Sequence, residues 1–277
     1  FSALLNYMRI PTKKLLTQKI LYLLTCVGLC WSSCTNEVDE FIGNVEPSTR
    51  SVSTALNANL ASLFTGGAPT LTSAEIKEVN DAYAKMTSIN CYRNIDEAVR
   101  NKTSYAGTIF LDDTYASAYF RKGSLAFPPY GILASSMEHE FIHMYQRDVQ
   151  GKKVDTDKEK RDTGMMEFEL AFYQGIIRYI HAGYSWTFKG EDGDPSYQSL
   201  WTSGLTDPSL IPQYEREFQT YVASICANGK PTSIDINEFV KWSNIFGEYS
   251  RGYSGKGYKF GNYDYGTSCI NSLLKLY

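Results

Sequence analysis

The feature that most constrains this chain is the stretch His139-Glu140-Phe141-Ile142-His143. On a helix, residues four positions apart lie on one face, so the imidazoles of His139 and His143 would stand one turn apart. Two neutral imidazoles at this spacing can bind a single zinc ion, with Glu140 beside the water that the ion holds. The ion would lower the pKa of that water, and Glu140 would accept its proton as the water attacks a carbonyl carbon. The chain has only three histidines, and this stretch uses two of them.

The surrounding sequence predicts that this stretch is helical. Between Gly131 and Gly151 there is no Gly or Pro, and apolar residues recur at helical spacing. These residues are Ile132, Leu133, Met137, Phe141, Met144 and Tyr145. We therefore expect a helix over about 130–150. The alternative is an ordinary amphipathic helix that carries two surface histidines.

A third zinc ligand is expected on the next helix, over about 163–182, because catalytic zinc sites usually have three protein ligands. The candidates are Glu167 and Glu169. Two residues along a helix correspond to about 200° of rotation, so only one of them can face the metal. Glu169 lies in the apolar stripe, where a carboxylate must be paired or metal-bound. Glu167 lies on the polar side, which suits a ligand in an open cleft. The residues alone do not decide between Glu167 and Glu169.

These motifs resemble those of the zincin metallopeptidases, in which short strands lead into a His-Glu-x-x-His helix. Gln146 and Val149 stand where the metzincin group has Gly and a third His, so the resemblance is to the gluzincin group. The run from Glu167 to Ala171 is similar to the Glu-x-Glu-Ala helix of several gluzincin families, although Leu170 replaces the usual Ala. In those families the first Glu is the ligand, which favours Glu167. The resemblance leaves Glu169 as a residue that orients an imidazole.

The expected fold class is α+β and zincin-like, with a small mixed or antiparallel sheet before the active-site helix. Residues 72–75 form a capping box that begins a helix, and strands are expected over 105–111, 114–121 and 124–127. The C-terminal half is expected to be mostly helical. Asp207-Pro208 and Asp235 would begin two of its helices, and Ser268 to Tyr277 would form the last. The Gly- and Tyr-rich segment 251–265 is read as an irregular loop or as a substrate rim whose tyrosine stabilises an oxyanion.

The first 34 residues are expected to be upstream residues and a signal peptide. Four basic residues precede the short apolar run 20–31, and Ser32-Ser33-Cys34 follows. This pattern resembles a bacterial lipoprotein signal, in which Cys34 would carry lipid. The acidic residues 37, 39 and 40 are similar to the surface-export signal of Bacteroides-type bacteria. The expected location is therefore the outer membrane or cell surface of a Gram-negative bacterium.

The remaining chain divides into a Ser-, Thr- and Asn-rich tether, residues 35–71, and a metallopeptidase domain, residues 72–277. The net charge of −3 gives no electrostatic case for nucleic acid, and the oligomeric state is left open. Cys91, Cys226 and Cys269 fit no zinc pattern and are expected to be small hydrophobic residues.

The resemblance implies zinc-dependent hydrolysis of a protein or peptide substrate by a surface-anchored lipoprotein. Zn²⁺ would be held by His139, His143 and Glu167 or Glu169, with Glu140 as general base. The alternative is a non-catalytic lipoprotein that keeps the scaffold and binds a glycan or protein. A structural zinc site in an assembly protein is the third reading.

Overall fold

The computed structural model of the chain describes residues 55–152, 160–181, 206–250 and 252–277. The expected signal peptide, its Cys34 and residues 35–54 of the expected tether lie outside the described residues. Within the described ranges, no helix combines the length and the apolar character that a bilayer span requires.

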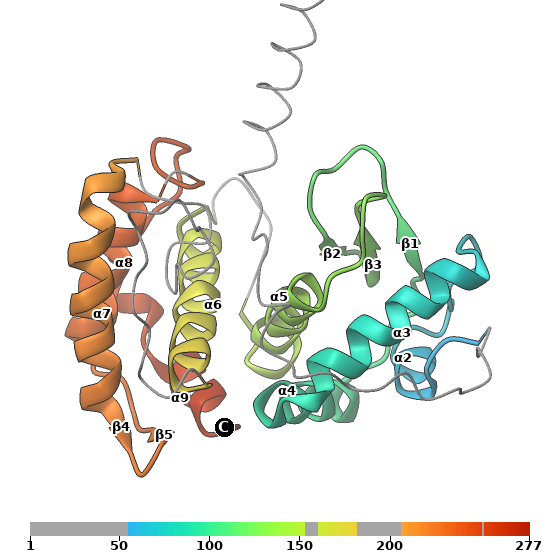
Figure 1. Cartoon of the computed structure of the whole chain (residues 1–277), viewed down its shortest axis with the longest axis horizontal. Helices are drawn as coiled ribbons and strands as arrows, with labels where there is room; N and C mark the ends of the chain where they lie inside the picture. Colours follow the sequence, from blue (N-terminus) through green and yellow to red (C-terminus); the bar gives the residue numbers. More distant parts are fainter. Residues whose placement is uncertain (1–54, 153–159, 182–205, 251) are drawn as a thin grey trace, which may run out of the picture.

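The fold is mixed α+β and mostly helical, as expected, with one small three-stranded sheet. Elements up to residue 152 form an N-terminal half, and those from residue 160 form a C-terminal half that stands beside it in Figure 1. The N-terminal half contains α2 (Ala58–Leu63), α3 (Ser73–Ser88), α4 (Asn90–Lys102), β1 (Ile109–Leu111), β2 (Tyr119–Arg121), β3 (Ser124–Phe127), α5 (Ala134–Met144) and the π-turn η1 (Tyr145–Val149). The C-terminal half contains α6 (Lys160–His181), η2 (Pro208–Leu210), α7 (Ile211–Ile225), β4 (Cys226–Ala227), β5 (Lys230–Pro231), α8 (Ile236–Tyr249), η3 (Tyr263–Tyr265) and α9 (Ser268–Leu274).

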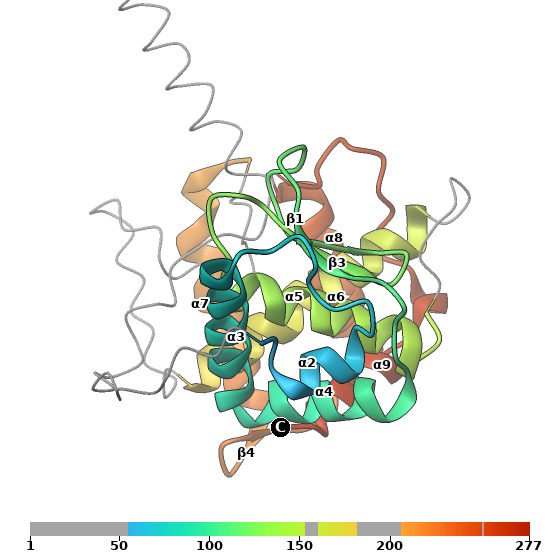
Figure 2. The same ribbon diagram turned by 90° about the vertical axis from the view of Figure 1, so that its right-hand side faces the viewer.

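The sheet has the strand order β1-β3-β2, so β2 is an edge strand. β1 pairs with β3 in parallel, and β2 pairs with β3 antiparallel across a tight hairpin. The sheet is therefore mixed. Figure 2 shows it above α2 and α4, beside α5.

Helix α3 begins where the sequence predicts it. Thr72 accepts a hydrogen bond from the backbone N–H of Glu75, and the Glu75 carboxylate accepts one from the backbone N–H of Thr72. This reciprocal capping satisfies two of the N–H groups that a helix start leaves without partners. Asp235 caps α8 in the predicted place, by accepting from the N–H of Asn237.

One hydrophobic core continues through both halves. It includes Val79 and Phe141 from the N-terminal half and Phe168, Phe172 and Phe239 from the C-terminal half, all fully buried. The Phe168 ring lies 5.1 Å from that of Phe172 and 5.0 Å from that of Phe239. α6 is thus anchored on its apolar side, which leaves its other face toward α5.

The packed domain starts earlier than the expected boundary at residue 72. Leu60, Leu63 and Phe64 are buried in the core, although they fall in the segment read as a tether. The backbone N–H of Ile109 in β1 also donates to the carbonyl of Gly67, which joins this segment to the sheet. The sequence allows a short helix over 55–64 within this segment, and α2 lies there. The Ser, Thr and Asn content led to the reading of the whole segment as a tether.

Candidate metal centre

α5 carries the His-Glu-x-x-His stretch, as the sequence predicts, but it is shorter than expected. It begins at Ala134, after Pro128-Pro129 and an extended Leu133. It then continues into the π-turn η1, where the N–H of Gln150 donates to the carbonyl of Tyr145. A π-turn inserts an extra residue into the helical repeat and is frequent at functional sites. Here it places Gln146 and Arg147 next to the histidines.

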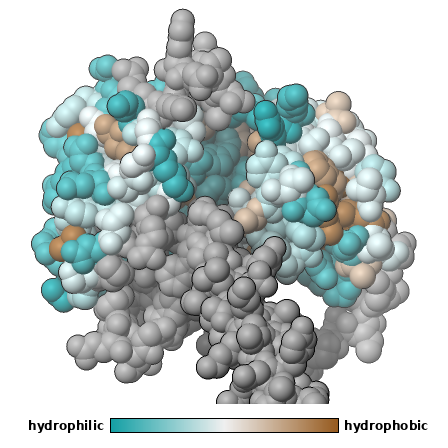
Figure 3. All heavy atoms as spheres, turned by 90° about the horizontal axis from the view of Figure 1, so that it is seen from above, coloured by the Kyte–Doolittle hydropathy of each residue, from teal (hydrophilic) through white to brown (hydrophobic). Residues whose placement is uncertain are grey.

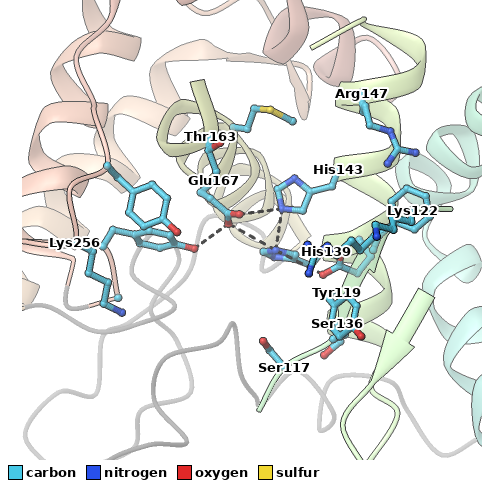
Figure 4. A pocket seen from close by; sticks show the side chains of 18 residues that line it. Ser117, Tyr119, Lys122, Ser136, His139, His143, Arg147, Thr163, Glu167 and Lys256 are labelled. Atoms are coloured by element: carbon cyan, nitrogen blue, oxygen red, sulfur yellow. Dashed lines mark hydrogen bonds and ion pairs between the residues drawn. The ribbon is translucent and has the colours of Figure 1, made fainter. Parts of the chain in front are cut away.

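His139, His143 and Glu167 come together between α5 and α6 (Figure 4). One ligand atom from each lies within 4.8 Å of the others. The two Nε2 atoms are 3.1 Å apart, and the Glu167 carboxylate oxygens lie 3.3 Å from His143 Nε2 and 3.8 Å from His139 Nε2. Ligands about 2.0–2.1 Å from one tetrahedral ion are separated by roughly 3.3 Å, so this donor set could hold a single shared metal ion.

Glu140 lies beside the triad but is not part of it. Its side chain is buried, 3.9 Å from His139 Nε2, and its carboxylate accepts a hydrogen bond from the backbone N–H of Phe120 in β2. The pKa of Glu140 is raised to about 8, mainly by burial and also by the charge of Glu167, against the opposing effects of His143 and the Phe120 N–H. A carboxylate with a pKa in this range suits acceptance and return of a proton near neutral pH.

The triad is electrostatically coupled. Burial alone lowers the pKa of His143, but the adjacent Glu167 carboxylate outweighs it, and the pKa is raised to about 9. Burial alone raises the pKa of Glu167, but the two imidazoles, His143 first, lower it to about 2. Burial and the charge of His143 lower the pKa of His139 to about 3. Glu167 is therefore ionised and ready to serve as an anionic ligand.

Glu169 is not part of the triad. It is fully buried, and its Oε2 accepts hydrogen bonds from Gln146 Nε2 at 2.8 Å and from Tyr265 OH at 2.9 Å. The Oε1 of Gln146 in turn lies 2.8 Å from His143 Nδ1. Glu169 thus reaches His143 through Gln146, and the structure brings Glu167 rather than Glu169 to the histidines.

The triad opens into a cleft of about 480 Å³. One wall comes from residues 117–122 in and around β2, and the other from α6 and the loop that follows α8. Figure 3 shows a hydrophilic recess between the two halves of the molecule on this side. The triad is therefore open to this cleft beside the edge strand β2.

Two contacts of the site were not identified from the sequence. Tyr253 donates a hydrogen bond from its OH to Glu167 Oε2 at 2.9 Å and, with Tyr258, lines the cleft. The sequence left the tyrosine-rich segment 251–265 as an irregular loop or a substrate rim, and nothing in its pattern singled out Tyr253. Gln146 is three residues beyond His143 on the same helical face, and that spacing was a usable signal for its role.

Comparisons of the chain with protein-family models, with curated proteins and with solved structures found no match.

Proposed function

We propose that this protein is a zinc-dependent peptidase of the gluzincin type. The observation that carries the proposal is the convergence of His139, His143 and Glu167 from two helices, with Glu140 beside them at the floor of an open cleft. Two imidazoles and one carboxylate are a ligand set of catalytic zinc sites, which leave a coordination position for water or substrate. The mixed sheet with its exposed edge strand next to the helix also suits a zincin scaffold.

When bound, zinc supplies Lewis acidity, which acidifies a water molecule and polarises the substrate carbonyl. Glu140 would accept a proton from the attacking water as the water oxygen bonds to the carbonyl carbon. The same carboxyl group then gives the proton to the amide nitrogen as the carbon–nitrogen bond breaks. The N–H of Phe120 keeps the carboxylate of Glu140 oriented. Tyr253 holds the Glu167 carboxylate in place through the hydrogen bond from its phenol.

The direct test is Glu140→Gln in the purified domain. We expect zinc binding to stay within a few-fold of the wild type, because Glu140 is not a ligand. We expect peptide hydrolysis to fall by at least about 10²–10⁴-fold, since the general base is removed. Peptide cleavage by the zinc-loaded proteins, followed by mass spectrometry, measures the loss.

Two further variants serve as controls. His143→Ala should lose both zinc and hydrolysis, whereas Glu138→Gln, next to the motif, should keep both. Undiminished hydrolysis by Glu140→Gln would remove this residue from the mechanism. Stoichiometric zinc with no cleavage of any peptide would favour a non-catalytic binding lipoprotein instead.

The cellular setting is part of the proposal. The Ser32-Ser33-Cys34 pattern favours a lipid-anchored protein at the outer membrane or cell surface, where a peptidase meets external proteins. Mass spectrometry of the protein purified from membranes should show a lipidated cysteine as its first residue. An intact, unmodified Cys34 in that preparation would contradict the anchor.

A further inference from the structure

We propose that the cleft selects peptides with acidic side chains close to the bond that is cut. This inference rests on the proposed function and names the substrate class of the same site. It follows from how charge is distributed over the walls of the cleft.

The acidic and basic residues that line the cleft occupy different places. Among the described residues, the only acidic lining side chains are Glu140 and Glu167, both at the metal-binding floor. The basic lining side chains are Arg121, Lys122, Arg147 and Lys256. The rim of the cleft is thus positive, although the whole chain has a net charge of −3.

Three of these four cations are not neutralised by the described part of the chain. Arg147 is paired with Asp148, at 2.6 Å. None of the ion pairs formed among the described residues includes Arg121, Lys122 or Lys256, whose side chains are exposed. Cations of one sign around a cleft raise the local concentration of anionic ligands.

Lys122 occupies a position where folding favours another residue. Arg121 pairs with Ser124, so Lys122 and Gly123 form a two-residue hairpin loop, with φ of 50° and 79°. Such a loop favours Asn, Asp or Gly at its first position because φ is positive at both residues. A lysine is strained there, and a role for its side chain at the cleft accounts for the choice.

The cations lie on both sides of Glu140 and the His139–His143–Glu167 group. Glu140 bonds the N–H of Phe120 in β2, and Lys122 lies two residues further on, in the hairpin loop, no more than roughly 7 Å away along the chain. Two residues of an extended peptide span a similar length. Lys256 comes from the opposite wall, and Figure 4 shows it across the His139–His143–Glu167 group from Lys122. Acidic side chains within about two positions on either side of the cut bond therefore match the rim.

The test compares two fluorescent decapeptides that share an apolar centre, one flanked by Asp and Glu and the other by Lys. Their affinities are measured for the zinc-loaded Glu140→Gln variant, which holds peptide without cutting it. Each exposed ion pair contributes about two- to five-fold in affinity, so we expect the acidic peptide to bind on the order of ten-fold tighter. The difference should largely vanish in 0.5 M NaCl, where the Debye length is only about 4 Å. It should also vanish in a Lys122→Glu/Lys256→Glu double variant.

The matched control is Lys102→Glu/Lys230→Glu, which changes the net charge equally at exposed sites outside the cleft lining. This control should keep the preference. Equal affinity for the two peptides, or the same loss in the control, would overturn the proposal, as would binding of a sulfated glycan but not of the acidic peptide. Lack of cleavage by the wild type would count against the peptidase, while the affinity comparison would still decide the preference.

Discussion

Among single residues, the orientation of the Gln146 amide determines which nitrogen of His143 faces the metal position. The Nε2 of Gln146 lies 2.8 Å from Glu169 Oε2 and 3.0 Å from the carbonyl of Met166, and a backbone carbonyl oxygen can only accept. The Oε1 of Gln146 therefore faces His143 Nδ1, which must carry the proton. The lone pair of Nε2 is therefore available to the ion. In metal sites, the hydrogen-bond partner of a ligating histidine commonly fixes its tautomer in this way.

Replacement of Gln146 by Leu should weaken zinc binding by about 10–100-fold, because the Nδ1–H of His143 loses its acceptor. Competition with a chelator measures the affinity. The control is Gln150→Leu, because the Gln150 amide donates to Tyr145 OH and not to a histidine. We expect this control to keep wild-type affinity. Wild-type affinity in Gln146→Leu would show that the hydrogen bonds from Glu169 through Gln146 to His143 do not affect zinc binding.

Zinc affinity should depend on pH with a defined sign. In the metal-free protein the pKa of His143 is raised to about 9, so the ring carries a proton at neutral pH that zinc must displace. The apparent association constant should therefore rise about ten-fold per pH unit between pH 7 and 9 and level off above that range. Calorimetry in buffers of different ionisation enthalpy would measure the released proton. No proton release at pH 7 would contradict the coupling between His143 and Glu167.

Among the elements, the position of the loop that carries Tyr253 depends on a glycine of α6. A Cβ at Gly164 would lie 2.7 Å from the carbonyl oxygen of Lys259 and 3.2 Å from Tyr258 Cβ. The close approach of α6 and the loop thus requires the absence of a side chain. Gly164 lies one turn before Glu167, on the same helical face.

Gly164→Ala should therefore lower both stability and hydrolysis. Alanine improves helix propensity by about 1 kcal/mol, but overpacking against a backbone carbonyl costs about 1–3 kcal/mol. The displaced loop would also move Tyr253 away from Glu167. Thermal unfolding and kcat/KM measure the two effects. Lys259→Ala, which alters only an exposed side chain, should leave both unchanged, and a more stable, fully active Gly164→Ala would refute the packing argument.

Local signals predicted some elements well and others poorly. The sequence predicted the helix caps at Thr72 and Asp235 and the helix that carries the His-Glu-x-x-His motif. All three depend on interactions between residues close in sequence. α4 was not predicted, since no side chain caps it and its charged residues obscure an apolar face built on Cys91, Ile95 and Val99. Two strands are shorter than predicted, because alternation does not show where pairing with β3 ends.

Across the whole molecule, the candidate metal centre joins the two halves of the fold. His139 and His143 come from α5 in the N-terminal half, whereas Glu167 comes from α6 in the C-terminal half. The sequence could propose Glu167 or Glu169, but the choice depended on how α6 rotates against α5. That rotation is fixed by the burial of Phe168 and Phe172 in the shared core, which no local pattern specifies.

Zinc should therefore stabilise the whole domain. At a free concentration one hundred times its Kd, a ligand that binds only the folded state adds about 2.7 kcal/mol. For a domain of this size the corresponding rise in Tm is roughly 5–10 °C. Scanning calorimetry with and without zinc measures it. Glu167→Ala should lose most of the rise, whereas Glu217→Ala, an exposed acid on α7, should keep it. An equal rise in Tm in both variants would show that zinc binds at another site.

X-ray absorption at the zinc edge tests the central claim most directly, because it reports the ligands of the ion. The zinc-loaded domain should show one ion per chain, with nitrogen and oxygen ligands at about 2.0–2.2 Å and the outer-shell scattering of two imidazole rings. A single ring, or sulfur ligands at about 2.3 Å, would contradict a centre built from His139, His143 and Glu167.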